Sequence, residues 1–90
     1  MREIIVSSRF KKDLKRAKRR GLNLEDISEI IDLLAQDAEL PKACRPHKLK
    51  GNFSGYWECH IHPDWLLVYD LDDDELLVLV ATGTHSDLFS

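Results

Sequence analysis

Residues 56–69 carry the clearest pattern of hydrophobic and polar positions in the chain. The first half of this stretch alternates, with one parity formed by Trp57, Cys59 and Ile61 and the other by Tyr56, Glu58, His60 and His62. A period of two is typical of a half-buried strand. Pro63 interrupts the alternation because proline cannot donate a ladder hydrogen bond, and an apolar run follows it. The sequence therefore predicts a β-hairpin with ionisable side chains close to its turn.

Helical spacing of apolar residues predicts two helices before this hairpin. The first starts at Ser8 as N-cap, stops at Gly21 and buries Phe10, Leu14 and Ala17. The second opens at Asn23 or Leu24 and is expected to end at Pro41. Its buried stripe consists of Leu24, Ile27, Ile30, Ile31 and Leu34. The short connection between the two makes a helical hairpin.

Further strands are predicted at residues 2–7 and 75–81, with a mobile loop at 41–55 and a turn at 72–74. This order of elements predicts an α+β two-layer sandwich, in which an N-terminal strand and the helical hairpin pack on an antiparallel sheet of four or so strands. Because the last two strands are apolar on both parities, the second face of the sheet also needs cover. The candidates are the loop before Gly51 and the C-terminal tail. The same arrangement would gather three histidines on the face away from the helices, namely His47, His60 and His85.

Length and cysteine content limit the possible classes of protein. The 90 residues, 43% of them hydrophobic, are expected to form a single domain spanning residues 1–90. No apolar run approaches the roughly 20 residues needed to span a bilayer, and the N-terminus lacks a secretory signal, so we expect a cytoplasmic protein. Cys44 and Cys59 are too few for a disulfide framework and are expected to be buried thiols.

The sequence predicts no metal site. Three consecutive aspartates at residues 72–74 lack the alternation and the glycine of a calcium loop. A zinc site would need His60 and His62 together with Cys44 or Cys59, and the parity of Cys59 opposes that combination.

Charge is divided unevenly along the chain, although the net charge is only -3. All 13 lysines and arginines lie between Arg2 and Lys50, together with eight acids, so residues 1–50 carry a net charge of +5. Residues 51–90 contain eight acids and no Lys or Arg, so their net charge is -8. Eight of the cations fall in the first helix, where like charges at helical spacing are unfavourable without a partner. We therefore expect a docking surface for RNA or an acidic protein segment, a solvated face being the alternative. Its residues are Lys11, Lys12, Lys15, Arg16, Lys18, Arg19 and Arg20.

Three spaced motifs resemble the YafQ branch of the RelE/ParE toxin superfamily. They are His47-x-Leu-x-Gly51, His60-x-x-Pro-Asp-Trp65 and Thr82-Gly-Thr-His-x-x-Leu-Phe89. The resemblance covers nearly the whole chain and implies a ribosome-dependent mRNA endoribonuclease without a cofactor, the toxin of a type II toxin-antitoxin pair. It also implies a cognate antitoxin of ribbon-helix-helix type. The toxin would contact operator DNA only through this antitoxin.

The resemblance carries a set of functional residues onto this chain: His47, His60, Asp64, Trp65, His85 and Phe89. Attack by a 2'-hydroxyl on phosphorus needs a base, an acid and donors for the extra charge, and imidazoles suit proton transfer near neutral pH. We expect His60 and His85 to be the acid/base pair, with Asp64 orienting one of them and His47 assisting at the phosphate. Trp65 and Phe89 would stack on bases or be core aromatics. The loop adds Lys48 and Lys50 as substrate-binding candidates.

Ala81 departs from the family pattern, as does Trp57, because members that it resembles usually carry arginine at the first position and often at the second. The Ala81 position is where the guanidinium would stabilise the transition state, and loss of one such donor costs about 2.7–4 kcal/mol. Ala81 therefore indicates a natural variant of attenuated activity, a substitution that allows a toxic protein to be produced, or an inactive interaction module that binds antitoxin and acts in transcriptional autoregulation. A gyrase-directed member of the superfamily is a further alternative, which the histidine motifs oppose.

Overall fold

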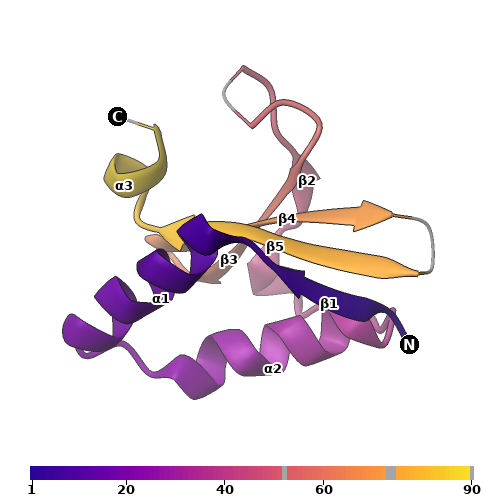
Figure 1. Cartoon of the computed structure of the whole chain (residues 1–90), viewed down its shortest axis with the longest axis horizontal. Helices are drawn as coiled ribbons and strands as arrows, with labels where there is room; N and C mark the ends of the chain where they lie inside the picture. The colour runs from indigo at the N-terminus through magenta and orange to yellow at the C-terminus, as the bar shows by residue number, and fades with distance from the viewer. Residues whose placement is uncertain (52, 73–74, 90) are drawn as a thin grey trace.

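The computed structural model describes residues 1–51, 53–72 and 75–89. In chain order the elements are β1 (Glu3–Val6), α1 (Ser8–Arg19), α2 (Leu24–Ala35), the 3-10 helix η1 (Lys42–Cys44), β2 (His47–Lys48), β3 (Trp57–His62), β4 (Trp65–Asp72), β5 (Leu76–Gly83) and α3 (His85–Phe89). The strands form one five-stranded sheet in the order β1-β5-β4-β3-β2. Helices α1 and α2 lie on one side of it, and α3 lies on the other (Figure 1). Within the described part, no helix combines the length and the apolar character that a membrane crossing requires.

The predicted α+β two-layer class is confirmed, but the sheet is mixed rather than wholly antiparallel. β1 runs parallel to β5, with Ile4 opposite Leu77, whereas the other three strand pairs are antiparallel. Only strands joined by a tight turn are obliged to be antiparallel. β1 is separated from β5 by most of the chain and joins the outer edge of the sheet, where Ile4, Ile5 and Val6 remain 37–43% exposed.

Side-chain caps set the starts of the two long helices. Ser7, one residue before the expected cap, accepts a hydrogen bond from the N–H of Phe10 at 3.0 Å and opens α1. Asn23 accepts from the N–H of Glu25 at 3.0 Å and opens α2, as predicted. Both contacts satisfy an N–H that the first turn of a helix leaves without an internal partner.

The expectation that α2 continues to Pro41 is wrong, because the helix ends at Ala35. Asp37 has a positive φ of 55°, and the N–H of Ala38 donates back to the carbonyl of Leu33 at 2.9 Å. This combination is the Schellman pattern, which closes a helix. The segment predicted as a loop then contains η1 and the short strand β2, and the predicted turn at 72–74 includes residues 73 and 74, which lie outside the described residues.

Two hydrophobic clusters lie on opposite faces of the sheet. The larger one joins the helices to the sheet through Phe10, Ala17, Ile27, Ile30, Leu34, Cys59, Trp65, Leu67, Tyr69, Leu77 and Leu79, among others. The smaller one consists of Leu66, Val68, Ala81 and Leu88, with Leu49, Phe53, Tyr56 and Val80 packed against it. Leu49 and Leu88 confirm that the loop before Gly51 and the C-terminal segment cover the second face. Both cysteines are buried free thiols, and burial raises the pKa of Cys59 to about 12.

Asp13 is a buried carboxylate that fastens α1 to β5. Asp13 is 5% exposed, and its Oδ2 accepts a hydrogen bond from the N–H of Thr82 at 3.1 Å. Arg9 and Arg16 lie 3.4 and 3.1 Å from its two oxygens. A buried charge is tolerated only when it is paired and hydrogen-bonded. Asp13 meets that condition and thereby fixes β5 just before the chain enters α3.

We predict that Asp13→Ala lowers the free energy of unfolding by about 2–3 kcal/mol, because it leaves the buried Thr82 N–H without an acceptor. Asp13→Asn keeps an acceptor oxygen and should be less destabilising. Urea unfolding measures both, and Glu29→Ala, at an exposed position of α2, is the control, expected within about 0.5 kcal/mol of the wild type. Equal stability of Asp13→Ala and the control would contradict this role for Asp13.

Candidate functional site

His60 and His85 meet at the end of the sheet where β3 turns into β4 and β5 leads into α3. Their ring centroids are 6.1 Å apart, although the residues come from different elements. The expectation that these two imidazoles converge is confirmed. Phe89 borders the same place, with its ring 6.5 Å from that of His85 and 6.0 Å from that of Phe53. At 36% exposure Phe89 is open to solvent, so contact with a substrate base stays a prediction for it.

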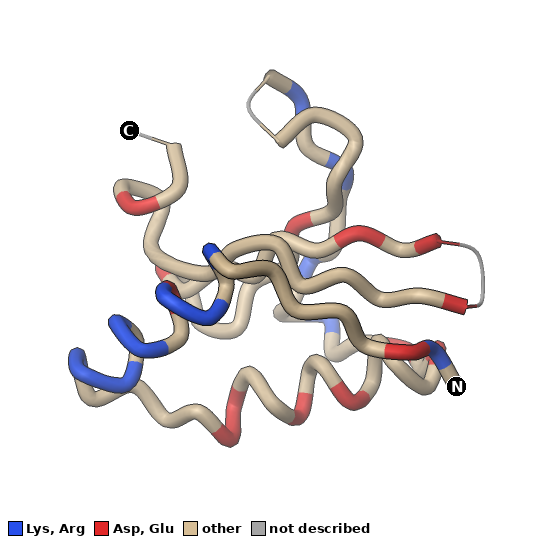
Figure 2. Tube along the Cα trace, viewed as in Figure 1, with Lys and Arg blue, Asp and Glu red and all other residues tan. Residues whose placement is uncertain are grey.

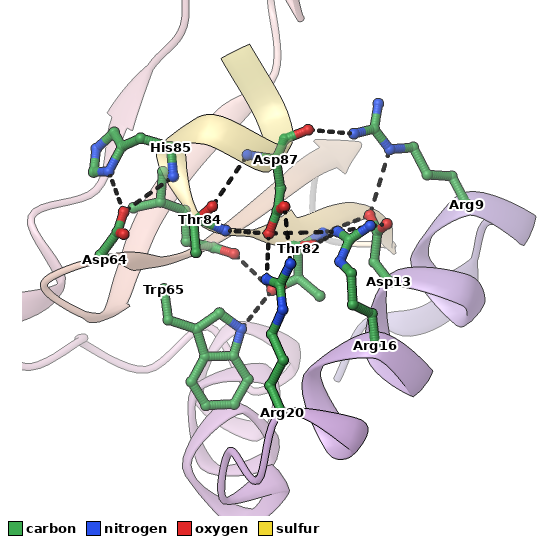
Figure 3. Close-up of polar contacts among 11 residues, drawn as sticks. Arg9, Asp13, Arg16, Arg20, Asp64, Trp65, Thr82, Thr84, His85 and Asp87 are labelled. Carbon is green, nitrogen blue, oxygen red and sulfur yellow. Dashed lines mark hydrogen bonds and ion pairs between the residues drawn. The ribbon is translucent and has the colours of Figure 1, made fainter. Parts of the chain in front are cut away.

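Asp64 holds His85 through two hydrogen bonds to the same carboxylate oxygen. The backbone N–H of His85 donates to Oδ1 at 3.0 Å, and its ring Nδ1 lies 2.7 Å from that oxygen (Figure 3). The backbone bond first, and the ring bond second, lower the pKa of Asp64 from its ordinary value. The side chains of both residues are more than half exposed. The pair is therefore a carboxylate–imidazole couple that faces solvent.

His60 has a different partner, the backbone carbonyl of Cys44, which lies 3.4 Å from its Nδ1. A carbonyl oxygen can only accept, so the proton of this contact belongs to Nδ1. The Nε2 atom of the neutral ring then has a free lone pair. His60 and His85 thus differ in electrostatic environment, because one ring contacts a neutral dipole and the other an anion.

His47 lies beside His60 on the same face, because β2 pairs with β3 so that His47 is opposite Glu58. Its Nδ1 is 3.0 Å from the carbonyl oxygen of Arg45, and its Nε2 is 3.5 Å from the carboxylate of Glu58. Glu58 is only 4% exposed. Sequence reasoning did not name it as a site residue, although its shared parity with His60 was the available signal.

The short helix α3, which carries His85, was not predicted, and polar contacts at its start stabilise it. The hydroxyl of Thr84 accepts from the N–H of Asp87 at 3.1 Å, and the carboxylate of Asp87 accepts from the N–H of Thr84 at 2.9 Å. This reciprocal pair is a capping box in which aspartate replaces the usual glutamate. A helix of five residues would not form by itself in water.

Two arginines, one from α1 and one from its C-cap, contact the same Asp87 (Figure 3). Arg20 donates to both carboxylate oxygens at 2.7 and 3.2 Å, and Arg16 lies 3.7 Å away. The hydrogen bond from Arg20 is the main reason that the pKa of Asp87 lies well below its ordinary value. A Cβ on Gly83 would be 2.8 Å from the Cβ of Asp87, so the glycine of Thr-Gly-Thr-His is required for this close approach. These contacts set the position of α3 and therefore of His85.

Two residues of the predicted docking surface are already engaged within the protein. Arg16 pairs with Asp13 and Arg20 with Asp87, although their side chains remain 32% and 45% exposed, so their part in docking stays a prediction. The remaining cations have no acidic partner in the ranges described: Lys11, Lys12, Lys15, Lys18 and Arg19. They belong to the strongly basic α1, whereas α2 is acidic (Figure 2). A groove of about 310 Å³ runs among Lys11, Leu14, Lys15, Lys18 and Leu24.

The structure places Trp65 and Lys48 differently from the expectation that both bind substrate. Trp65 is 2% exposed, and its indole N–H donates to the hydroxyl of Thr82 at 2.9 Å, so it is a core residue and not a stacking platform. The ammonium of Lys48 lies 5.7 Å from the ring of Trp57, on the face opposite His47 because neighbouring strand residues alternate. Lys50 is exposed, and its contact with substrate stays a prediction.

His62 does not share the face of His60, contrary to the sequence alternation. A register shift between His60 and His62 turns His62 toward α2, where its Nε2 is 2.7 Å from Asp26 and its ring stacks on Trp65. In a bulge one extra residue disturbs the alternation of a strand. The His-x-His pair required for the zinc alternative is therefore not formed. Among residues 1–51, 53–72 and 75–89, no cluster of three or more potential metal ligands occurs.

Ala81, the position expected to hold arginine, is fully buried in the cluster beneath α3. Its methyl group packs with Leu66, Val68 and Leu88. No lysine or arginine follows Lys50 in the sequence, so the site receives cations only from segments that precede it.

Comparison with known proteins gives consistent matches over the whole chain. A family described as the bacterial toxin YafQ of type II toxin-antitoxin systems matches residues 2–90. The mRNA interferase toxin YafQ of Escherichia coli K12 is 37% identical over 89 residues, which cover 98% of this chain and 96% of that protein. Crystal structures of YafQ from E. coli BL21(DE3) and of the E. coli DinJ-YafQ complex superpose with TM-scores of 0.92 and 0.91 at 35% and 36% identity, each covering 100% of both chains.

We predict that the stabilisation supplied by the charge of Asp87 depends on pH. Because folding lowers its pKa, the stabilisation is complete above the unfolded pKa of about 3.9 and is lost as the pH falls through the folded pKa. Asp87→Asn keeps a capping oxygen but no charge. Chemical unfolding should show it about 1 kcal/mol less stable at pH 7, a difference that shrinks below about pH 4.

The matched control is Asp32→Asn, at an exposed position of α2. Its difference from the wild type should stay small at every pH. A deficit of Asp87→Asn that is as large at pH 2 as at pH 7 would show that the charge is not responsible.

Proposed function

The chain belongs to the YafQ family of bacterial toxins of type II toxin-antitoxin systems, and from this premise we propose that it is a metal-independent, ribosome-dependent endoribonuclease that cleaves mRNA. The observation that supports this most directly is the approach of His60 and His85 to 6.1 Å, with Asp64 bound to His85. Two imidazoles at this separation can contact the two ends of one phosphodiester through hydrogen bonds of about 2.7–3.0 Å.

The partners of the two rings assign their roles in the proposed reaction. His60 is the base, because its Nδ1 proton is directed to a carbonyl and its Nε2 can take the proton of the 2'-hydroxyl. His85 is the acid, because the Asp64 carboxylate compensates the positive charge of its protonated ring. The 2'-oxygen attacks phosphorus, the bond to the 5'-oxygen breaks, and His85 protonates that oxygen as it leaves. The products are a 2',3'-cyclic phosphate and a 5'-hydroxyl.

His47 completes the proposed centre at the phosphate. It lies next to His60 and is held by the buried Glu58 and by a backbone carbonyl. We assign it to stabilising the charge that develops on phosphorus, a contribution that preorganised donors make in such sites. Since Ala81 supplies no cation there, the reaction is expected to be slower than in a member with arginine.

The ribosome and an antitoxin are the proposed partners of this cytoplasmic toxin. Residues 51–90 carry eight acids and no lysine or arginine, so the site itself attracts RNA poorly and needs the ribosome to position the message. The E. coli relative has been crystallised in a complex with DinJ. By analogy we propose a cognate antitoxin of ribbon-helix-helix type, which would also be the only contact with operator DNA.

The alternative is an interaction module that binds the antitoxin and regulates transcription without cleaving RNA. The buried alanine at position 81 favours it, because a fully enclosed methyl group contributes nothing to the stabilisation of a phosphorane.

We predict that His60→Gln and His85→Gln each lower the rate of mRNA cleavage on translating ribosomes by about 100-fold or more. Asp64→Asn should also lower it, and this effect should disappear in the His85→Gln background because Asp64 acts through that ring. Primer extension on purified ribosome complexes measures the cleavage.

Asp32→Asn is the control, since this exposed residue lies on α2, on the other side of the sheet from His60, and should leave the rate unchanged. Cleavage that survives both His60→Gln and His85→Gln would refute the assignment of the active site. Equal cleavage of free mRNA would refute the dependence on ribosomes, and no cleavage by the wild type would favour the interaction module.

We further predict that Ala81→Arg raises the cleavage rate, because it supplies a guanidinium where family members usually have one; a preorganised donor contributes about 100- to 1000-fold. Position 81 is buried, so thermal unfolding is measured alongside. A folded Ala81→Arg protein that cleaves no faster would contradict the view that this position limits the reaction.

A further inference from the structure

A groove of about 620 Å³ opens beside His60, which forms part of its lining. One wall comes from η1 and the residue after it, and the other from the end of β3 and its turn. The lining residues are Lys42, Ala43 and Arg45 on the first wall and His60, Ile61, His62 and Pro63 on the second. His85 does not line this groove.

The backbone at Arg45 holds an unusual conformation at the edge of this groove. Its φ is 47°, in the left-handed region that L-residues other than glycine seldom adopt. Contacts on both sides fix it: its N–H donates to the carbonyl of Lys42 at 3.2 Å, and its own carbonyl contacts the ring of His47 at 3.0 Å. The preceding Cys44 is buried. A strained residue held from several directions is a reasonable candidate for a functional role.

The two cations of the groove have no acidic partner in the part of the chain that the structure describes. Neither Lys42 nor Arg45 forms an ion pair there, whereas Arg9, Arg16 and Arg20 all do. Both side chains are exposed. Unpaired cations around a groove favour an anionic occupant, and the apolar surface of Ile61 and Pro63 suits a sugar or a base.

We propose that this groove binds the nucleotide on the 5' side of the scissile bond, with Arg45 contacting the phosphate on the 5' side of that nucleotide. The inference rests on the proposed function, in which His60 takes the proton from the 2'-hydroxyl of this same nucleotide. A guanidinium presents a planar fork of donors that matches phosphate oxygens, and Lys42 adds a second positive charge. Arg45 thereby becomes a substrate-binding residue on the upstream side of the cleavage site.

A binding experiment with an uncleavable probe tests the proposal. The probe is a dinucleotide whose first sugar is 2'-deoxy, prepared with and without a 5'-phosphate, and NMR titration of backbone amides gives each Kd. For the wild type the 5'-phosphate should tighten binding about tenfold, with shifts at Ala43 and Ile61. Arg45→Ala should abolish this gain, and Arg45→Lys should keep part of it because lysine retains the charge.

Glu29→Ala, which removes an exposed charge of α2, is the control and should behave as the wild type does. In the wild type, the affinity gained from the 5'-phosphate should also fall with added salt. In Arg45→Ala, where no gain is expected, added salt should affect the two probes alike. The proposal is overturned if the 5'-phosphate does not improve binding, if its benefit survives Arg45→Ala, or if the shifts map to α1.

This experiment is independent of catalysis, so the two ideas fail separately. If His60→Gln leaves ribosomal cleavage intact while the groove still selects the 5'-phosphorylated probe through Arg45, the catalytic assignment is wrong and the binding site stands. If His60→Gln abolishes cleavage but Arg45→Ala changes neither affinity nor salt dependence, the groove proposal alone is wrong.

Discussion

The contact of Arg16 and Arg20 with Asp87 is the constraint on which the candidate site depends. His85 belongs to a helix of five residues, which is too short to be stable alone. Arg20 and Arg16 reach it from the opposite layer of the fold, while Asp13 fixes β5 just before it. The position of the exposed His85 ring is thus set by ionic contacts of Asp87 with Arg16 and Arg20. The apolar side of α1 is buried in the larger cluster, on the other face of the sheet. Without that constraint, only the contacts of His85 with Asp64 and the packing of Leu88 would hold the ring near His60.

The division of charge along the sequence has two separate structural uses. Part of the basic first helix is neutralised internally, by Asp13 from the same helix and by Asp87 from the acidic second half. The lysines on its outer surface are not used in this way. A count of charges along the sequence cannot distinguish the paired arginines from these outer lysines. One pairing acid, Asp87, is 67 residues from Arg20, and the other, Asp13, is four residues from Arg9.

The sequence predicted what depends on local periodicity and missed what depends on long-range polar contacts. The hairpin, the two helices and the two-sided burial of the last strands follow from apolar spacing, and the motifs located His60, Asp64 and His85. The parallel pairing of β1, the capping box of α3 and the roles of Asp13 and Glu58 could not be derived, since each requires the relative placement of distant segments. The bulge before the turn reversed His62, because alternation holds only while a strand stays regular.

The outer edge of β1 has a consequence for the behaviour of the protein at high concentration. This strand ends the sheet, and three of its apolar side chains are partly exposed. An unprotected edge offers backbone donors and acceptors to any extended chain that meets it, which makes it a starting point for aggregation. Its brevity, four residues, limits that tendency. Association between copies at high concentration is therefore expected to begin at β1, the strand farthest in sheet order from β2.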